Sequence, residues 1–362
     1  MRTTRQLATI QKIDNEVPIQ GKDKIVLATM EGLGWQVIVQ KDQIKVGDLV
    51  VFAETDSVFP EKPEFEFLRS KKFRIKTMKM GGVLSQGICF PLNILPEGNY
   101  KQGDDVTKLL GITQYEPTMD IEKETVISKK GKYPKFLMRM AWFRKLVLPK
   151  KESKGFPDFL SKTDETRIQN APFYLQMNKK WIETEKIDGQ SGTFALKRIK
   201  SKFPFVKDKF EYIVCSRNLR LWEKDNSSYW KVSDRYNIEN FLRNTIGDRD
   251  WIAIQGECIA PNVQGNKYHV TEADLYVFNL IYPTGRLGSE IAKNICEQHG
   301  LKFVPIVNTN ITLPSTVNEI LDYVTHDSVL YPTLREGSVF RSKDGKLSFK
   351  AVSPDFLIKH NE

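Results

Sequence analysis

A lysine two residues before an Asp-Gly pair is the strongest chemical signal in the sequence: Lys186, Asp188 and Gly189. A lysine amine is a nucleophile only without its proton, and its reference pKa of about 10.4 keeps it protonated at neutral pH. Nearby positive charge, from a bound metal ion or from Lys350, would lower that pKa, whereas a neighbouring carboxylate would raise it. Asp188 is therefore better suited to position a hydrated metal ion than to act as a base.

Five short motifs follow Lys186 in order, and two segments precede it. The downstream motifs are Ser216-Arg217-Asn218, Gly256-Glu257, Tyr276-Val277-Phe278, Glu336-Gly337-Ser338-Val339 and Ser348-Phe349-Lys350, and the upstream segments are 156–157 and 162–169. The set resembles the covalent nucleotidyltransferase superfamily of ATP-dependent ligases and RNA capping enzymes. Within it, the sequence is most similar to RNA ligases of the nick-sealing kind, over roughly residues 156–355.

The resemblance implies an ATP-dependent RNA ligase with Mg²⁺ or Mn²⁺ as its metal. Lys186 would attack the α-phosphate of ATP to form lysyl-AMP, and the AMP would pass to an RNA 5′-phosphate that is then joined to a 3′-hydroxyl. The expected substrate is a nick in a duplex, in RNA repair. Two alternatives are a capping guanylyltransferase and a noncatalytic RNA-binding protein that kept the fold. Capping enzymes usually carry an OB domain after the catalytic domain, whereas few residues follow Lys350.

The resemblance also assigns roles to single residues. Phe278 would stack on adenine, Glu257 would accept a hydrogen bond from the ribose, and Glu336 would share the metal with Asp188. The catalytic set is Lys186, Asp188, Lys346 and Lys350; the ATP-binding set is Glu185, Arg217, Glu257, Phe278 and Glu336; the metal set is Asp188, Glu257 and Glu336; and the nucleic-acid set is Arg74, Lys76, Arg217 and Asn218. Taken alone, Phe278 in the apolar run 275–281 would be a core residue.

The last motif departs from the family pattern. Related ligases usually show Lys-x-Lys, whereas this chain has Ser348 before Lys350. Residues 346, 348 and 350 alternate by two and share one face of a strand, so we expect Lys346 to supply part of the missing positive charge.

The predicted fold class is α+β, with an N-terminal OB-fold β-barrel and an ATP-grasp-like nucleotidyltransferase domain. The expected domains are 1–115, a basic linker 116–155, and 156–362. Short β-rich runs predict strands at 25–30, 35–39, 49–52, 87–92, 210–215, 251–254, 275–281 and 347–352. Apolar spacing predicts helices at 236–246, with Asp234 as a candidate cap, and at 317–324.

The net charge of +10 is concentrated in one segment, because 129–154 holds ten basic residues against one acidic residue. Its apolar part, 135–148, is open to three interpretations: a helix docked between domains, a basic aromatic wedge on nucleic acid, or a membrane-surface helix. A second basic stretch, 69–79, predicts either a strand with a phosphate-binding face and Phe73 and Ile75 inward, or a solvated edge strand.

Other classes of protein find little support. No run approaches the roughly 18 apolar residues of a membrane span, and the N-terminus lacks the apolar centre of a secretory signal. The four cysteines and four histidines show no metal-site spacing, and there is no P-loop. We therefore expect a soluble intracellular protein, neither secreted nor membrane-spanning. We also expect a monomer, and the resemblance implies that its partners are RNA ends or nicked duplexes.

Overall fold

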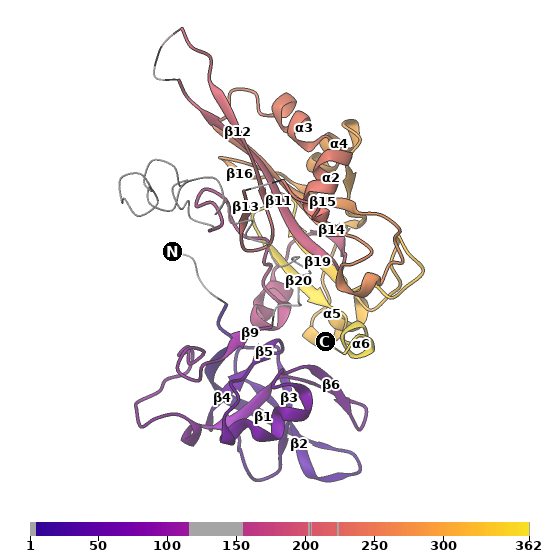
Figure 1. The fold of residues 1–362 in the computed structure, drawn as a ribbon. Coiled ribbons are helices and arrows are strands. Elements are labelled where there is room, and N and C mark those ends of the chain that lie inside the picture. The colour runs from indigo at the N-terminus through magenta and orange to yellow at the C-terminus, as the bar shows by residue number, and fades with distance from the viewer. Residues whose placement is uncertain (1–4, 116–154, 202, 204, 223, 362) are drawn as a thin grey trace, which may run out of the picture. The chain divides into compact units, whose positions relative to one another are not determined.

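The computed structural model describes residues 5–115, 155–201, 203, 205–222 and 224–361 (Figure 1). Among these, a first compact unit takes 5–115, 165–187 and 305–361, and a second unit takes 155–164 and the described part of 188–304. The predicted domain boundaries follow chain order instead and stay a prediction. The basic segment 129–154, with its apolar part 135–148, lies outside the described residues.

The N-terminal part of the first unit is an antiparallel sheet in the order β3-β2-β1-β4-β8. Its strands are β1 (Ala8–Ile19), β2 (Lys22–Met30), β3 (Gln36–Gln40), β4 (Leu49–Ala53) and β8 (Ile88–Pro91). The first half of β1 pairs with β4 and its second half with β2, with a register shift between Ile13 and Asn15. A bulge bends a strand, which lets β1 serve both halves of the sheet. The four strands predicted here are confirmed.

The basic stretch 69–79 is not a single strand. A 3₁₀ helix, Pro63–Lys71, ends in a turn where Lys72 and Phe73 have positive φ angles of 54° and 59°. Two short pairs complete this part: β5 (Ser57–Val58) with β9 (Thr113–Gln114), and β6 (Thr77–Met80) with β7 (Val83–Gln86).

The predicted basic face is wrong at its centre. Phe73 and Ile75 are buried as predicted, but Arg74 is buried too, at 7% exposure, and Lys76 is half-buried. The guanidinium of Arg74 donates to Asp56 at 2.7 Å, so the positive charge of Arg74 is paired inside the protein.

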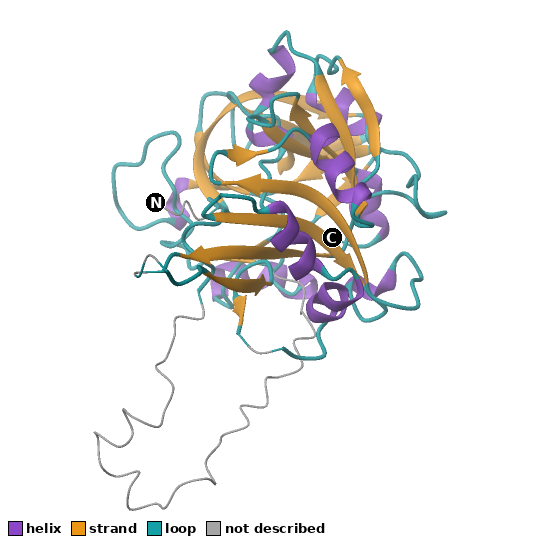
Figure 2. Ribbon diagram, turned by 90° about the horizontal axis from the view of Figure 1, so that it is seen from above, coloured by secondary structure: helices purple, strands orange, loops and turns teal. Residues whose placement is uncertain are grey.

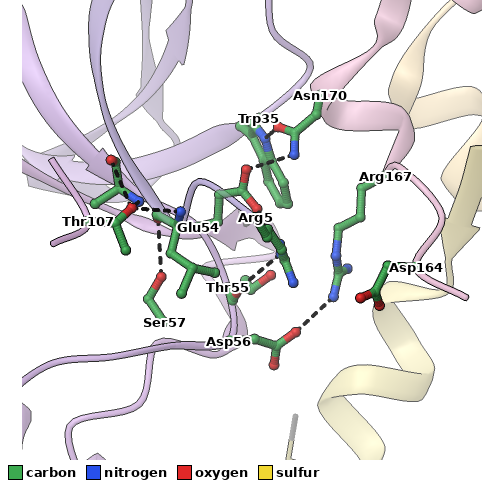
Figure 3. Close-up of polar contacts among 12 residues, drawn as sticks. Arg5, Trp35, Glu54, Thr55, Asp56, Ser57, Thr107, Asp164, Arg167 and Asn170 are labelled. Atoms are coloured by element: carbon green, nitrogen blue, oxygen red, sulfur yellow. Dashed lines mark hydrogen bonds and ion pairs between the residues drawn. The ribbon is translucent and has the colours of Figure 1, made fainter. Parts of the chain in front are cut away.

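Asp56 joins the N-terminal sheet to the segment that follows Glu165 (Figure 3). Its second carboxylate oxygen accepts from Arg167 at 3.0 Å. Burial by itself would raise the pKa of Asp56, but the charges of Arg167, Arg74 and Arg5 outweigh burial and hold that pKa below its usual range. Beside this cluster, Asn170 donates to Glu54 at 2.7 Å.

The rest of the first unit is an antiparallel sheet in the order β18-β10-β19-β20. Its strands are β18 (Ile306–Ile311), β10 (Trp181–Lys186), β19 (Gly337–Ser342) and β20 (Ser348–Val352), with helices α5 (Val317–Tyr323) and α6 (Pro354–Lys359). Trp181, Phe340 and Phe349 share one apolar core with Ile320 and Leu321 of α5. Because successive side chains on a strand point to opposite faces, the residues between these core positions lie on the other face.

The second unit is built on a larger sheet, in the order β13-β12-β11-β14-β15-β16, with β17 parallel to β15. Its strands are β11 (Gln190–Ile199), β12 (Lys209–Cys215), β13 (Arg220–Leu221), β14 (Trp251–Ile259), β15 (Asp274–Tyr282), β16 (Gly285–Arg286) and β17 (Lys302–Phe303). Three helices pack against this sheet: α2 (Ser228–Arg235), α3 (Ile238–Thr245) and α4 (Ser289–Gln298) (Figure 1). Phe156 and Leu160 form a separate cluster with Ala195, Ile213 and Ala253.

The predicted helices are confirmed as α3 and α5, in a mixture of strands and helices that Figure 2 shows. The predicted cap is wrong, because Asp234 belongs to α2 and Asn237, with a φ of 47°, precedes α3. The strands predicted in the second half of the chain are confirmed as β12, β14, β15 and β20. Among the described residues, no helix combines the length and apolarity of a membrane span.

We predict that Asp56→Asn lowers the free energy of unfolding by about 3 kcal/mol, because it leaves buried arginines without their counter-charge. The folded pKa of Asp56 lies below the ordinary value of 3.8, so ionised Asp56 stabilises the fold above about pH 4, and this contribution is lost as the pH falls through the folded pKa. Urea unfolding at several pH values should therefore show the two proteins converging at acidic pH. Asp250→Asn, which breaks the exposed pair with Lys200, is the control and should change little. Equal stability of the Asp56 variant and the wild type at pH 7 would contradict the prediction.

Candidate functional site

In the first unit, Lys186 is the last residue of β10 and lies opposite Gly337 of β19. Its ammonium donates to the carboxylate of Glu336, the residue before β19. The side chains of Lys186 and Glu336 are 22% and 12% exposed, so the pair is accessible but not surrounded by water. The structure thus brings together the predicted nucleophile and one predicted metal ligand.

Lys350 lies on the same face of this sheet as Lys186. In the β10–β19–β20 register, Thr184 is opposite Val339 and Val339 is opposite Lys350, two pairs along from Lys186 and Gly337. The face opposite the apolar core therefore carries both lysines. The backbone N–H of Lys350 also donates to Thr166 at 2.8 Å, which fixes this strand from its other side.

Gly337 is required by the backbone. Its φ is +149°, and a β-carbon there would lie 2.2 Å from the carbonyl oxygen of Ala351. Only glycine allows β19 to begin this close to β20 with that φ. The Glu-Gly order of the motif therefore places the carboxylate of Glu336 at the start of the strand, beside Lys186.

The strand face predicted to include Lys346 is wrong, because β20 begins at Ser348 and Lys346 lies exposed in the preceding turn. The carboxylate of Asp344 accepts from the backbone N–H of Lys346 at 3.1 Å and from Ser342 at 2.5 Å, which holds this turn. Any contribution of Lys346 to catalysis would have to come from the turn.

A buried arginine lies opposite the serine that replaces the usual lysine. Arg341 pairs with Ser348 across β19 and β20 and is 2% exposed. Its guanidinium donates to Thr184 at 3.0 Å and to Glu165 at 3.4 Å, and Ser348 donates to the same Glu165 at 2.5 Å. Arg341 of β19 therefore adds a positively charged group to this face, where it is paired with the carboxylate of Glu165.

Glu185 lies on the opposite face from Lys186. It is 1% exposed, and its carboxylate accepts from the Ser328 hydroxyl at 2.5 Å and from the Val329 N–H at 2.8 Å. The structure does not bring its carboxylate together with Lys186 and Lys350, and its assignment to ATP stays a prediction.

In the second unit, Asp188 is the first residue of the longer segment, 188–304, and is 8% exposed. One carboxylate oxygen of Asp188 accepts from Lys267 at 2.6 Å, and its backbone N–H donates to the hydroxyl of Tyr268 at 2.7 Å. A β-carbon on Gly189 would lie 2.5 Å from the carbonyl oxygen of Cys258 and 3.1 Å from Glu257. The missing side chain at Gly189 thus lets the chain pass close to β14. Asp188 therefore directly precedes a residue that lies against Glu257.

Phe278 lies at a β-bulge. Gln255 of β14 pairs with Asn279, but the next residue, Gly256, pairs with Val277, so Phe278 has no partner across the strands. A β-carbon on Gly256 would be 2.7 Å from Leu275, which shows how closely the strands approach here. Bulges re-aim side chains beside functional sites. Phe278 is half-buried, whereas Tyr276, Val277 and Leu280 of the same strand are buried, so the core interpretation of this residue is not supported.

Arg217 and Asn218 follow β12 in a loop that contacts the segment 162–164. Arg217 pairs with Asp164 at 2.5 Å, and Lys162 donates to Asn218 at 2.6 Å. The structure therefore links two motifs that are more than fifty residues apart in sequence. Arg74 and Lys76 lie in the N-terminal part of the first unit, and their assignment to nucleic acid stays a prediction.

Comparison with known proteins agrees with this arrangement. The RNA ligase family matches residues 179–359, half of the chain, and an OB-fold domain matches residues 7–92. The chain belongs to the RNA ligase family. The ligase resembles a solved lysine-to-alanine mutant of the Naegleria gruberi RNA ligase with ATP and Mn, at 30% identity and a TM-score of 0.79, over 99% of this chain and 98% of that chain.

Two further solved structures of the same Naegleria gruberi RNA ligase are similar over 99% of both chains, each with a TM-score of 0.79. One contains PPi and is 30% identical to this ligase, and the other is a glutamate-to-alanine mutant with AMP and Mn at 29% identity. A comparison with curated proteins found no significant match. The predicted family, the OB-fold and the nucleotidyltransferase-like α+β architecture are confirmed.

Sequence reasoning missed Lys267, Tyr268 and Arg341. The first two lie about eighty residues after Asp188, in a loop without a motif that the resemblance identified. Arg341 could have been found from the pattern, because it follows Val339 by two residues and shares its strand face.

We predict that Gly189→Ala destabilises the second unit by about 1–3 kcal/mol, because the added methyl group meets backbone that cannot rotate away. Urea unfolding is the measurement. Gly98→Ala is the matched control, since a β-carbon at Gly98 would meet only the flexible side chain of Tyr100, at 3.1 Å. Equal unfolding midpoints for the two variants would contradict this account of the motif.

Proposed function

We propose that this ATP-dependent RNA ligase works through a lysyl-AMP intermediate on Lys186 and seals nicks in duplexes whose 3′-hydroxyl strand is RNA. The observation that carries the proposal is the placement of Lys186 at the end of β10, on one sheet face with Lys350 and in contact with Glu336. A nucleophile, a cation for phosphate and an acidic residue for a metal are the groups that the first step requires.

In the first step, the Lys186 amine attacks the α-phosphorus of ATP. A P–N bond forms, the bond from the α-phosphorus to the bridging oxygen breaks, and pyrophosphate leaves. The amine must first separate from Glu336 and lose its proton. Lys350 stabilises the negative charge that grows on the α-phosphate oxygens.

In the second unit, Phe278 and Glu257 are proposed to bind the nucleoside. The bulge gives Phe278 an exposed part that can stack on adenine, and Glu257 on the neighbouring strand accepts from a ribose hydroxyl. Arg217 and Asn218 align the ribose or the RNA 3′ end, and their partners Asp164 and Lys162 fix the loop that carries them.

The metal is proposed to be Mg²⁺ or Mn²⁺, positioned by Asp188 and Glu336, with Glu257 as a further candidate. Among the described residues, no group of three or more His, Cys, Asp and Glu could hold a metal ion unaided. Both carboxylates bind a lysine ammonium, so each position accommodates positive charge. A hydrated ion held partly by substrate phosphates fits this donor set. When bound, it would neutralise charge that develops on the α-phosphate. The ATP and Mn in the solved relatives support this proposal.

In the later steps, the RNA 5′-phosphate attacks the phosphorus of lysyl-AMP and releases the lysine. The RNA 3′-hydroxyl then attacks the activated 5′-phosphate and releases AMP, which closes the phosphodiester. The OB-fold domain is proposed to contribute nucleic-acid affinity, as this scaffold does elsewhere. The enzyme is proposed to act as a monomer.

We expect Lys186→Ala to abolish covalent labelling of the protein by ATP labelled at the α-phosphate, while sealing of preadenylylated RNA continues, because only the first step uses the amine as nucleophile. The measurements are gel labelling and ligation of the two substrates. Lys180→Ala, which changes an exposed lysine just before the same strand, should label normally. Labelling by GTP instead of ATP would support a capping enzyme, and AMP recovered on a peptide without Lys186 would refute the assignment.

Lys350→Ala should slow self-adenylylation roughly 10²–10³-fold, the effect of removing one group aimed at developing charge. Lys346 is exposed in a turn, so its charge is screened by water. We therefore expect Lys346→Ala to change the rate of self-adenylylation by less than about threefold. Single-turnover rates of AMP attachment are the measurement. A larger loss for Lys346→Ala than for Lys350→Ala would show that the turn, rather than the strand, supplies the cation.

A further inference from the structure

The loop 263–270 surrounds the Asp188-Gly189 pair with side chains that the known motifs do not include. Gln264 donates to the carbonyl oxygen of Gly189 at 3.3 Å, and Tyr268 accepts from the backbone N–H of Asp188. Between them, Lys267 donates to the Asp188 carboxylate at 2.6 Å. Three residues within five positions of one loop therefore contact two adjacent residues of the nucleophile motif.

The backbone of this loop adopts an uncommon conformation. Gln264, Gly265, Asn266 and His269 have positive φ angles of 49°, 67°, 51° and 53°. Asn266 secures the bend, because its amide donates to the carbonyl of Val270 at 3.0 Å and its side-chain oxygen accepts from the Val270 N–H at 2.9 Å. Such conformations persist where the surroundings determine them, and they cluster at functional sites. The position of Lys267 is thus fixed by the residues on both sides of it.

We propose that Lys267 is a positioning residue whose ammonium competes with the divalent metal ion for the Asp188 carboxylate, and so sets the metal concentration that the ligase requires. The inference rests on the proposed role of Asp188 in metal positioning. The proposal adds a residue outside the motifs. The metal concentration that the ligase requires would then depend on the loop 263–270.

The pair differs from an ordinary surface ion pair. The side chains of Lys267 and Asp188 are 12% and 8% exposed. A hydrated cation and an ammonium both take carboxylate oxygens as partners, so occupation of the shared oxygen by one weakens occupation by the other. The second unit offers a matched comparison: Lys302 donates to Asp274 at the same 2.6 Å, but the Lys302 side chain is 45% exposed and Asp274 lies outside the motifs.

The test measures binding of Mn²⁺ to the full-length protein in saturating AMP by electron paramagnetic resonance, because the proposed site is completed by a nucleotide phosphate. Lys267→Met should bind Mn²⁺ about tenfold more tightly than the wild type. This is the change expected when one charge-assisted hydrogen bond no longer competes with the metal ion for the carboxylate. Lys267→Arg retains the charge and Lys302→Met is the matched control, so both should bind like the wild type. Equal or weaker binding by folded Lys267→Met would overturn the proposal.

A second measurement needs no substitution at Lys267. Acylation of lysines in the wild-type protein, followed by mass spectrometry, should show faster labelling of Lys267 when Mn²⁺ is added, because its ammonium leaves the carboxylate. Labelling of Lys302 should not change. This readout decides the question if Lys267→Met fails to fold, and an unchanged labelling rate at Lys267 would refute the competition.

Asp188→Asn separates failure of this proposal from failure of the proposed function. If Asp188→Asn weakens Mn²⁺ binding but Lys267→Met binds like the wild type, only the role of Lys267 is wrong. If Asp188→Asn binds Mn²⁺ like the wild type, Asp188 does not position the metal, and both proposals fail. Weaker binding by Asp188→Asn together with tighter binding by Lys267→Met supports both.

Discussion

The register in which β10 pairs with β19 determines which side chains meet in the first unit. On one face, Trp181 and Phe340 join the apolar core, and on the other Lys186 lies beside the start of β19. A slip of one residue would turn Lys186 into the core and bring Trp181 out of it. The buried side of the strand pair therefore enforces the position of the nucleophile.

A buried acidic residue strengthens this constraint. Glu183 is fully buried in β10, and its carboxylate accepts from Arg335 at 3.2 Å, from Ser338 at 2.7 Å and from Tyr323 at 2.7 Å. A buried ion pair adds little net stability, but breaking one is costly, because it leaves an unpaired charge in the interior. Any register that separates Glu183 from Arg335 and Ser338 would incur this cost in free energy. A single alignment of β10 with β19 is therefore favoured.

The sequence alone predicts those features of the fold and the site that depend on residues close together in the chain. The β-rich run 347–352 predicts that Lys350 lies on a strand, and the ordered motifs predict the family, whereas the strand that carries Lys186 was not predicted. Features that depend on pairing between distant segments could not be predicted in this way. The bulge at Phe278 exists only because β14 and β15 shift register at Gly256, and Arg74 is buried only because Asp56 accepts its guanidinium. The turn held by Asp344 delays the start of β20, which removed Lys346 from the expected face.

The short segment from Thr166 to Gln169 has hydrogen bonds on both sides. The carbonyl of Thr166 accepts from the N–H of Lys350 at 2.8 Å, and the carbonyl of Gln169 accepts from the N–H of Gly34 in the N-terminal domain at 2.7 Å. One stretch of backbone thus connects the loop between β2 and β3 to the strand that carries a proposed catalytic lysine. Exchange of this OB-fold for another, in evolution or in engineering, would have to reproduce an acceptor for Gly34 and an alignment of β20 at once, so the two modules are expected to change together rather than as interchangeable parts.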